Sequence, residues 1–503
     1  MRNPVVTSLL VLLSLAACGA DSPRPPPPNF CPERPVYMAP RGPGQMMTRS
    51  RPLPSAFLAK RASLPLLAEA RARDTAEPTE WGGSWWASPC LMGTPGLEVA
   101  TPRVGVATDG RALSVWMEWD GIDEWLWFSE FVPQTGWTPS ERMKLQRDFP
   151  DDPIRVRQPQ VVAGADGRML ALWLQSEGSR AAELWFAEHV PGEGWVPPAR
   201  VLAQPLGDVT FLQAVRDGAG VLTLAWTQFD GDTLSENVWA TRGSPSAGWA
   251  AARRIDTPVP GFSVEPQLSV SSDGHVLVGW YRFDEMEGWS GAWFSRWSSA
   301  EGWSAAERLS PAGFESFFVE PLAGPGGSAL AMWSEGGVAN VSLWARRYVP
   351  GTGWGAAEKV EEALGSSAMA QASTEKDGRA MVVWPRARSG IIRLSARAYD
   401  FNLGWRERLD VDPSPLGGVT DPQVVSLSRN QALVVWTREK DGVFRVGSSR
   451  YAPGQGWGRT AWLDTVPSSQ NGFPQLSVNG TGVGVATWLH GGEVPGIGLS
   501  VFQ

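Results

Sequence analysis

A Gly-Trp pair recurs seven times along this 503-residue chain at nearly constant spacing. Successive pairs lie 51 to 58 residues apart, and self-similarity at such a period indicates a repeat architecture. The pairs are Gly136-Trp137, Gly194-Trp195, Gly248-Trp249, Gly302-Trp303, Gly353-Trp354, Gly404-Trp405 and Gly456-Trp457. This repeat limits the possible folds more than any other feature of the chain.

Each repeat has the pattern of four short β-strands. The first strand leads into an Asp-Gly turn such as Asp273-Gly274, which is typical of a tight hairpin because its central residues need positive φ. The second strand is a nearly continuous apolar run that ends in a tryptophan such as Trp280, as expected for a strand buried on both faces. A third strand follows, and the fourth begins at the Gly-Trp pair. Four strands per unit of about 40 to 50 residues predict an all-β fold, a β-propeller.

We expect the propeller to span residues 81–503 and to contain eight four-stranded blades. The eighth unit, from Phe473, keeps its Trp488 but ends at Gln503 before a fourth strand. The segment Trp86–Met92 resembles a Gly-Trp strand, so an N-terminal strand could complete this blade and leave it no free edge. Seven blades is the alternative if the last unit packs differently.

The N-terminus has the pattern of a secretion signal. Arg2 precedes a short apolar stretch over residues 5–17, which is too short to span a bilayer. Leu15-Ala16-Ala17-Cys18 resembles the lipobox of bacterial lipoproteins. The resemblance implies a lipoprotein signal peptide over 1–17, a lipid on Cys18, and a Pro-rich tether and linker over 18–80. By the same resemblance Gly19 favours the outer membrane. An ordinary signal peptide is the alternative.

Cysteine content and net charge limit the possible disulfides and binding partners. An exported protein can form disulfides, so Cys31 and Cys90 are a possible pair, with two free thiols as the alternative. The net charge of −8 argues against nucleic-acid binding, which requires a basic surface. We expect a monomer that contacts the membrane through its lipid anchor.

Chemistry-bearing motifs are scarce. The three histidines show no metal-ligand spacing, and no phosphate loop or nucleophile elbow is present. We therefore expect no catalytic residue, metal or cofactor, calcium being the one ion we consider. Sialidases are the natural enzymatic comparison, and they use a tyrosine nucleophile with an acidic partner. Tyr281 and Tyr37 are the tyrosines outside the repeat pattern.

The candidate ligand face consists of the loops between second and third strands. Some of these loops combine tryptophan with carboxylates, which suits sugar stacking, a cationic partner or calcium, although acidic hairpin loops are also ordinary solvated surface. The candidates are Trp119, Asp120, Asp123, Trp125, Asp230, Asp232, Asp284, Glu287 and Trp289.

Residues 84–503 resemble a class of bacterial envelope proteins with tandem tryptophan-rich units. Ser328–Trp333 and Leu343–Trp354 match the repeated pattern closely. The resemblance implies a β-propeller lipoprotein, distantly similar to sialidase and lectin propellers. We expect a non-catalytic binding or scaffold module for protein or glycan. A glycoside-acting, sialidase-like hydrolase is the alternative.

Overall fold

The computed structural model describes most of the region predicted to be the propeller. The described residues are 31, 84–85, 89–164, 166–202, 207–257, 261–284, 288–337, 340–362, 369–375, 378–388, 391–412, 417–427, 430–464, 468, 471–492 and 495–503. The signal peptide, Cys18 and most of the predicted tether lie outside them.

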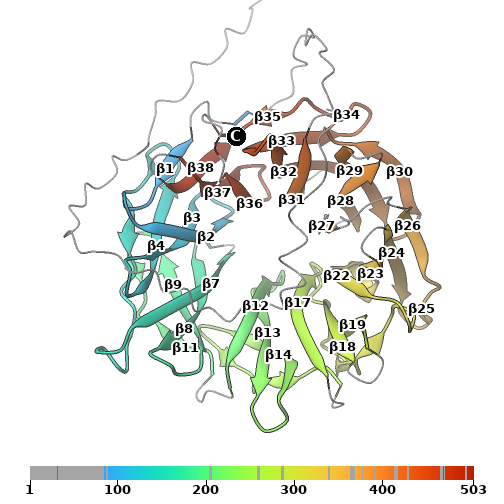
Figure 1. Ribbon diagram of the computed structural model, residues 1–503, viewed down its shortest axis with the longest axis horizontal. Helices are drawn as coiled ribbons and strands as arrows, with labels where there is room; N and C mark the ends of the chain where they lie inside the picture. The colour runs from blue at the N-terminus through green and yellow to red at the C-terminus, as the bar shows by residue number, and fades with distance from the viewer. Residues whose placement is uncertain are drawn as a thin grey trace, which may run out of the picture.

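The strands are arranged around a central axis as the sheets of a β-propeller, which confirms the predicted fold (Figure 1). The first unit contains β2 (Glu98–Val106), β3 (Ala112–Trp119), β4 (Glu124–Val132), β5 (Gly136–Trp137) and β6 (Glu141–Arg142). The second contains β7 (Ile154–Ala163), β8 (Met169–Glu177), β9 (Glu183–Val190), β10 (Gly194–Trp195) and β11 (Ala199–Arg200). The third contains β12 (Val209–Arg216), β13 (Leu222–Asp230), β14 (Ser235–Ser244), β15 (Gly248–Trp249) and β16 (Arg253–Arg254).

The remaining units repeat this order. The fourth contains β17 (Phe262–Val270), β18 (Val276–Asp284), β19 (Trp289–Ser298), β20 (Gly302–Trp303) and β21 (Glu307–Arg308). The fifth contains β22 (Ser316–Ala323), the 3₁₀ turn η2 (Pro325–Gly327), β23 (Ala329–Gly337), β24 (Asn340–Val349), β25 (Gly353–Trp354) and β26 (Glu358–Glu362). The sixth contains β27 (Gln371–Thr374), β28 (Arg379–Arg388), β29 (Ile391–Asp400) and β30 (Gly404–Asp410). The seventh contains β31 (Gly418–Leu427), β32 (Gln431–Lys440), β33 (Val443–Ala452), β34 (Gly456–Trp457) and β35 (Ala461–Trp462). The eighth contains β36 (Gly472–Val478), β37 (Gly484–His490), β38 (Gly496–Phe502) and the N-terminal β1 (Cys90–Met92).

Hydrogen bonding groups the described strands into seven sheets. Six of them correspond to single units, and the ten-stranded sheet contains the third and fourth units. One parallel residue pair, Glu236 with Phe262, joins those two units. The number of blades depends on whether this sheet is divided at that pair, so eight blades stays a prediction.

An N-terminal strand completes the last unit, as expected from the missing fourth strand. β1 pairs antiparallel with β38, and Trp85 forms a bridge with Phe502. The Trp85 and Phe502 rings meet edge to face with centroids 5.4 Å apart, matching the 5.4 Å between Trp137 and Phe131 in the first unit. Trp85 therefore occupies the Gly-Trp position, one residue before the expected Trp86, which lies outside the described residues.

The glycine of each Gly-Trp pair serves a hairpin turn. All seven glycines have positive φ, between 71° for Gly302 and 95° for Gly136, a conformation that glycine adopts without steric cost. In the eighth unit Ser84 stands before Trp85 in place of glycine. The closing strand enters from outside the unit and needs no hairpin turn, which explains why the eighth copy lacks glycine.

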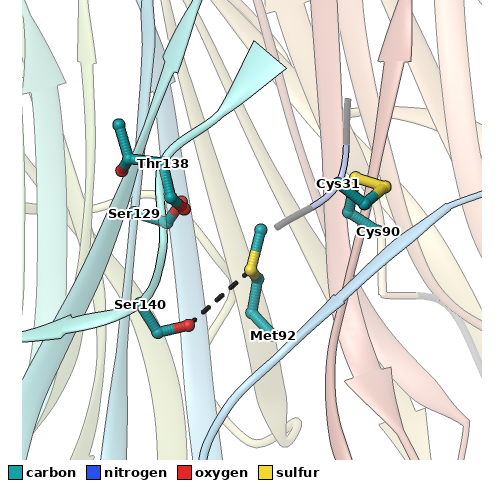
Figure 2. The surroundings of a disulfide bond; sticks show 6 residues. All are labelled: Cys31, Cys90, Met92, Ser129, Thr138 and Ser140. Carbon is teal, nitrogen blue, oxygen red and sulfur yellow. Dashed lines mark hydrogen bonds between the residues drawn. A yellow bond between two sulfur atoms is a disulfide. The ribbon is translucent and has the colours of Figure 1, made fainter. Parts of the chain in front are cut away.

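A disulfide joins Cys31 to Cys90 of β1, with the two Cα atoms 5.3 Å apart (Figure 2). Cys90 is fully buried in the cluster between the last and first units, which also contains Trp116 and Val501. Beside it, the Ser140 hydroxyl lies 3.7 Å from the Met92 sulfur. The bond thus attaches the segment around Cys31 to the closing strand.

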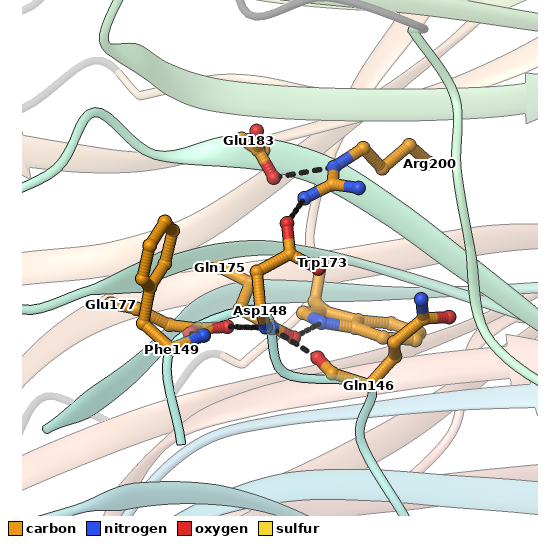
Figure 3. Close-up of polar contacts among 8 residues, drawn as sticks. All are labelled: Gln146, Asp148, Phe149, Trp173, Gln175, Glu177, Glu183 and Arg200. Atoms are coloured by element: carbon orange, nitrogen blue, oxygen red, sulfur yellow. Dashed lines mark hydrogen bonds and ion pairs between the residues drawn. The ribbon is translucent and has the colours of Figure 1, made fainter. Parts of the chain in front are cut away.

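Second-strand tryptophans form the core between neighbouring units. All eight of these side chains are fully buried: Trp116, Trp173, Trp226, Trp280, Trp333, Trp384, Trp436 and Trp488. Two residues after the tryptophan, four units carry an acceptor for the indole N–H, as between Trp173 Nε1 and Gln175 Oε1 at 3.1 Å. The Gln175 amide also donates to the Gln146 carbonyl at 2.7 Å (Figure 3). This position therefore connects the core to the backbone between units.

The innermost strands carry a second repeated polar position. It pairs with the residue before each second-strand tryptophan, and it holds Arg103, Gln160, Gln213, Gln267, Glu320, Gln371, Gln423 and Gln475. Glutamine is thus the common residue of this inner ring, and Arg103 and Glu320 are the charged exceptions. Just before it, seven inner strands contain a β-bulge.

The bulge of each of these seven strands includes a non-glycine residue with positive φ. These residues are Thr101, Gln158, Phe211, Glu265, Phe318, Asp421 and Phe473, with φ between 47° and 55°. Such conformations cost on the order of 1–3 kcal/mol each and are common at ligand sites.

The bulges lie toward one end of the ring, which we call the loop face. It carries the loops between second and third strands and the connections between units, whereas the opposite turn face carries the Asp-Gly and Gly-Trp turns.

Candidate functional site

The predicted ligand residues of the first unit form one hairpin on the loop face. Trp119 is 41% exposed. Asp120 accepts backbone bonds from Ile122 and Asp123 and a 3.2 Å bond from the Trp125 indole. The Arg142 guanidinium carbon lies 4.3 Å from the centre of the Trp125 ring. Asp123 accepts the Ile154 N–H of the next unit at 2.9 Å. Apart from Trp119, these side chains are engaged in the protein's own contacts.

The candidates in the third and fourth units lie in separate hairpins of the same face. Asp230 accepts the Thr233 hydroxyl at 2.8 Å, and this bond, with backbone bonds from residues 232 and 233, holds the pKa of Asp230 below its ordinary value. Asp232 lies in the same exposed turn. Asp284 pairs with Trp289, which is 44% exposed. Glu287 lies outside the described residues. The described candidates thus share a face and belong to three separate hairpins.

A second feature of the loop face is a cavity of about 1000 Å³ between the seventh, eighth and first units. We call it the loop-face cavity. None of the predicted ligand residues lines it. His490 does, as the last residue of β37.

A third feature is a half-buried cluster at the loop-face end of the third and fourth units. The Tyr281 phenol and the carboxylate of Glu265, the positive-φ residue of the β17 bulge, interact electrostatically. Val264 pairs with Tyr281 across the two strands, so the bulge places Glu265 beside the phenol. Glu236 of β14 interacts electrostatically with Tyr281, and Asp208 with Glu236.

Burial dominates the electrostatics of this cluster. It raises the pKa of Glu265, an effect that the neighbouring Tyr281 hydroxyl opposes. Burial and the neighbouring Glu265 carboxylate raise the pKa of the Tyr281 phenol well above its ordinary value. Burial also raises the pKa of Glu236, and the charge of Asp208 raises it further. The phenol therefore stays protonated at neutral pH, beside two carboxyl groups whose raised pKa values favour proton transfer near neutral pH.

Sequence reasoning identified Tyr281 only as a tyrosine outside the repeat pattern and missed Glu265 and Glu236. Inner strands carry different residues at the bulge position, so the sequence gives no sign that Glu265 faces a phenol. Among the described residues, no group of three or more His, Cys, Asp or Glu side chains is arranged to hold a metal ion. In the same part of the chain, no helix has the length and hydrophobicity needed to cross a membrane.

No family model and no curated protein sequence matches the chain. Solved structures match it in fold. A polysaccharide lyase, an ulvan lyase, is 10% identical with a TM-score of 0.46, covering 72% of this chain and 94% of that one. A leech intramolecular trans-sialidase is 8% identical with a TM-score of 0.39, covering 82% and 92%. An α-L-arabinanase from Penicillium chrysogenum is 12% identical with a TM-score of 0.38, covering 58% and 92%.

These likenesses concern the fold, and they confirm the similarity to sialidase-type propellers at that level only. The expectation that the protein is not an enzyme is wrong by these comparisons, since the matching structures include sialidases, a polysaccharide lyase and an arabinanase. That expectation rested on the lack of recognisable motifs. A tyrosine and a glutamate on neighbouring strands form no motif in the sequence, so their pairing could not be read there.

Proposed function

We propose that this protein is a glycoside hydrolase that acts on a glycan at the loop face, with Tyr281 as nucleophile. The observation that carries the proposal is the pairing of the Tyr281 phenol with Glu265, whose backbone is held at a φ of 55° in the β17 bulge beside Tyr281. A phenol is a weak nucleophile unless an adjacent base takes its proton. Glu265, on the neighbouring strand, is the group that would take the proton.

The proposed first step is attack of the Tyr281 oxygen on the anomeric carbon. The phenolic proton moves to Glu265, and the glycosidic C–O bond breaks as Glu236 protonates the leaving oxygen. Glu236 suits the acid role because burial and Asp208 raise its pKa, so that more of it is protonated near neutral pH. Water, deprotonated by Glu236, then cleaves the glycosyl-tyrosine while Glu265 returns its proton to the phenol.

The charge of the cluster favours a sugar without a carboxylate. Glu265 and Glu236 interact with the phenol and Asp208 interacts with Glu236, and an anionic substrate would be repelled by any of the three that is ionised. The nearest cation in sequence, Arg282, follows Tyr281 in β18, but it is buried and already donates to Ser263 at 3.0 Å. We therefore propose a neutral or cationic glycoside as substrate rather than a sialoside.

The test is turnover of a panel of 4-methylumbelliferyl glycosides and of polysaccharides by reducing-end assay. It compares the wild type with Tyr281→Phe, Glu265→Gln and Glu236→Gln. We expect each of the three to lower kcat by about 10²- to 10⁴-fold, and Tyr348→Phe to leave it unchanged, because Tyr348 packs edge to face on Trp354 in the repeat pattern. No turnover across the panel, or full activity in Tyr281→Phe, would overturn the proposal.

We further propose that the enzyme is a monomeric lipoprotein of the outer membrane. The pattern around Cys18 supports this location, and the Cys31–Cys90 disulfide agrees with folding in an oxidising compartment. In this arrangement the tether over 18–80 would connect the lipid to the closing strand of the propeller.

A further inference from the structure

The loop-face cavity is built from strand ends that the Tyr281 cluster does not include. Its lining comes from the start of β2, the starts of β31 and β36, and the loop-face ends of β32 and β37. At about 1000 Å³ it is at the upper end of the range typical of small-ligand sites. It therefore has room for several sugar rings.

The charges around this cavity have one sign. Glu98, Asp421 and Glu439 line it from three different strands, and its described lining includes no lysine or arginine. The Thr420 hydroxyl donates to one oxygen of Asp421 at 2.9 Å, and the Gly442 N–H donates to one oxygen of Glu439 at 2.8 Å. Each bond occupies one carboxylate oxygen, so the cavity can offer anionic acceptors to a cationic ligand.

An aromatic surface lies beside these carboxylates. Phe473 lines the cavity and is 47% exposed, and its φ of 51° is unusual for a bulky side chain. Exposed rings are the surfaces on which the C–H faces of sugars stack, and an ammonium group is also attracted to a ring face. The bulge at Phe473 thus presents an aromatic ring to the cavity.

Thr437 is the observation that points most directly to a ligand. It lines the cavity, its residue is 1% exposed, and its hydroxyl has no hydrogen-bond partner in the described structure. A buried hydroxyl without a partner costs about 1–3 kcal/mol. A ligand hydroxyl or amine in the cavity would supply the missing partner.

We propose that the loop-face cavity binds an oligosaccharide that carries free amino groups. The ammonium groups pair with Asp421 and Glu439, a sugar ring stacks on Phe473, and a ligand polar group bonds the Thr437 hydroxyl. An extended lysine peptide is the competing ligand, because β2, β31 and β36 are edge strands of their sheets, but it has no ring that could stack on Phe473. The site does not depend on the Tyr281–Glu265 pair.

The experiment is isothermal titration calorimetry of the full-length chain in detergent with a β-1,4-linked glucosamine tetrasaccharide. The fully N-acetylated tetrasaccharide and tetralysine serve as comparison ligands. We expect the amino form to bind at least about tenfold more tightly than the acetylated form, a difference of roughly 1.4 kcal/mol. Turnover by the same preparations is measured in parallel, so that failure of this site and failure of the hydrolase proposal are distinguishable.

Three variants locate the binding. Phe473→Gly removes the ring at a φ that glycine tolerates, Asp421→Asn keeps a residue type that accepts positive φ, and Thr437→Val removes only the unpartnered hydroxyl. We expect each variant to weaken binding about tenfold without lowering Tm. The control is Phe314→Ala, at a residue 54% exposed on the same face, and we expect it to leave binding unchanged. The proposal fails if the amino tetrasaccharide does not bind or binds no better than the acetylated form. It also fails if tetralysine binds more tightly, or if the three variants bind like the wild type.

Discussion

Replacing Glu320 by glutamine should stabilise the propeller at neutral and alkaline pH. Glu320 is 9% exposed, and one of its carboxylate oxygens accepts the Ala372 N–H of the next unit at 2.9 Å. Six of the other seven units carry glutamine at this position of the inner ring. A glutamine at 320 keeps an oxygen for the Ala372 N–H and removes the ionisable group.

The magnitude follows from the ionisation of the buried carboxyl. Burial raises the pKa of Glu320 from 4.5 to about 8. Its contribution to stability is fully present below about pH 4.5 and is lost as pH rises through about 8, because the unfolded chain ionises first. A shift of this size corresponds to roughly 5 kcal/mol at high pH. Local relaxation reduces it, so we expect Glu320→Gln to gain about 2 to 5 kcal/mol over wild type.

The assay is urea denaturation followed by tryptophan fluorescence at pH values near 5 and 9. The two proteins should differ little at the lower pH and diverge at the higher one. Glu362→Gln is the matched control, because the Glu362 side chain is 71% exposed. If Glu320→Gln and wild type show the same change in stability between the two pH values, ionisation of Glu320 does not destabilise the folded protein.

Three further outcomes are expected. Trp85→Ala should lower the free energy of unfolding in urea by roughly 2–4 kcal/mol, since Trp85 packs on Phe502 and its indole donates to Ser448 at 3.0 Å. The control Trp462→Ala, at a residue 40% exposed, should lower it by under about 1 kcal/mol. Equal losses in the two variants would argue against closure by Trp85. Cys31→Ser should lower stability by about 2–4 kcal/mol and abolish the mobility shift of the wild type between reducing and non-reducing gels; an unchanged shift would contradict the disulfide. Cys18→Ser should move the protein from the membrane pellet to the soluble fraction, and retention in the pellet would count against the lipid anchor.

The repeat made the fold predictable because every unit solves the same packing problem with the same residues. The hairpin turns require glycine at positive φ, and the space between units requires a large apolar side chain such as Trp280 or Trp333. Those demands appear in the sequence as a fixed period. The closing strand was also predictable from the missing fourth strand, but its register was not. The chain does not turn from β38 into this strand, which comes from the N-terminal side, so a Gly-Trp pair does not mark the position.

The candidate site was not predictable for the opposite reason. Exposed tryptophans and acidic loops such as Trp119 and Asp230 attracted attention, yet in the first and third units the acids close their own hairpins. The residues proposed to act on a substrate lie at positions that differ from unit to unit. Glu265 occupies a bulge where other units have threonine, glutamine, phenylalanine or aspartate, and only the three-dimensional pairing of β17 with β18 brings it to Tyr281.

Covalent trapping of the proposed glycosyl-tyrosine tests most directly whether Tyr281 is the nucleophile. The protein is incubated with fluorinated glycosyl fluorides of the sugars that it turns over, which slow breakdown of the intermediate. Peptide mapping by mass spectrometry then locates any adduct. We predict one sugar on Tyr281, lost in Tyr281→Phe and slower to form in Glu265→Gln. An adduct on a carboxylate, or turnover without any adduct on Tyr281, would contradict the assignment of Tyr281 as nucleophile.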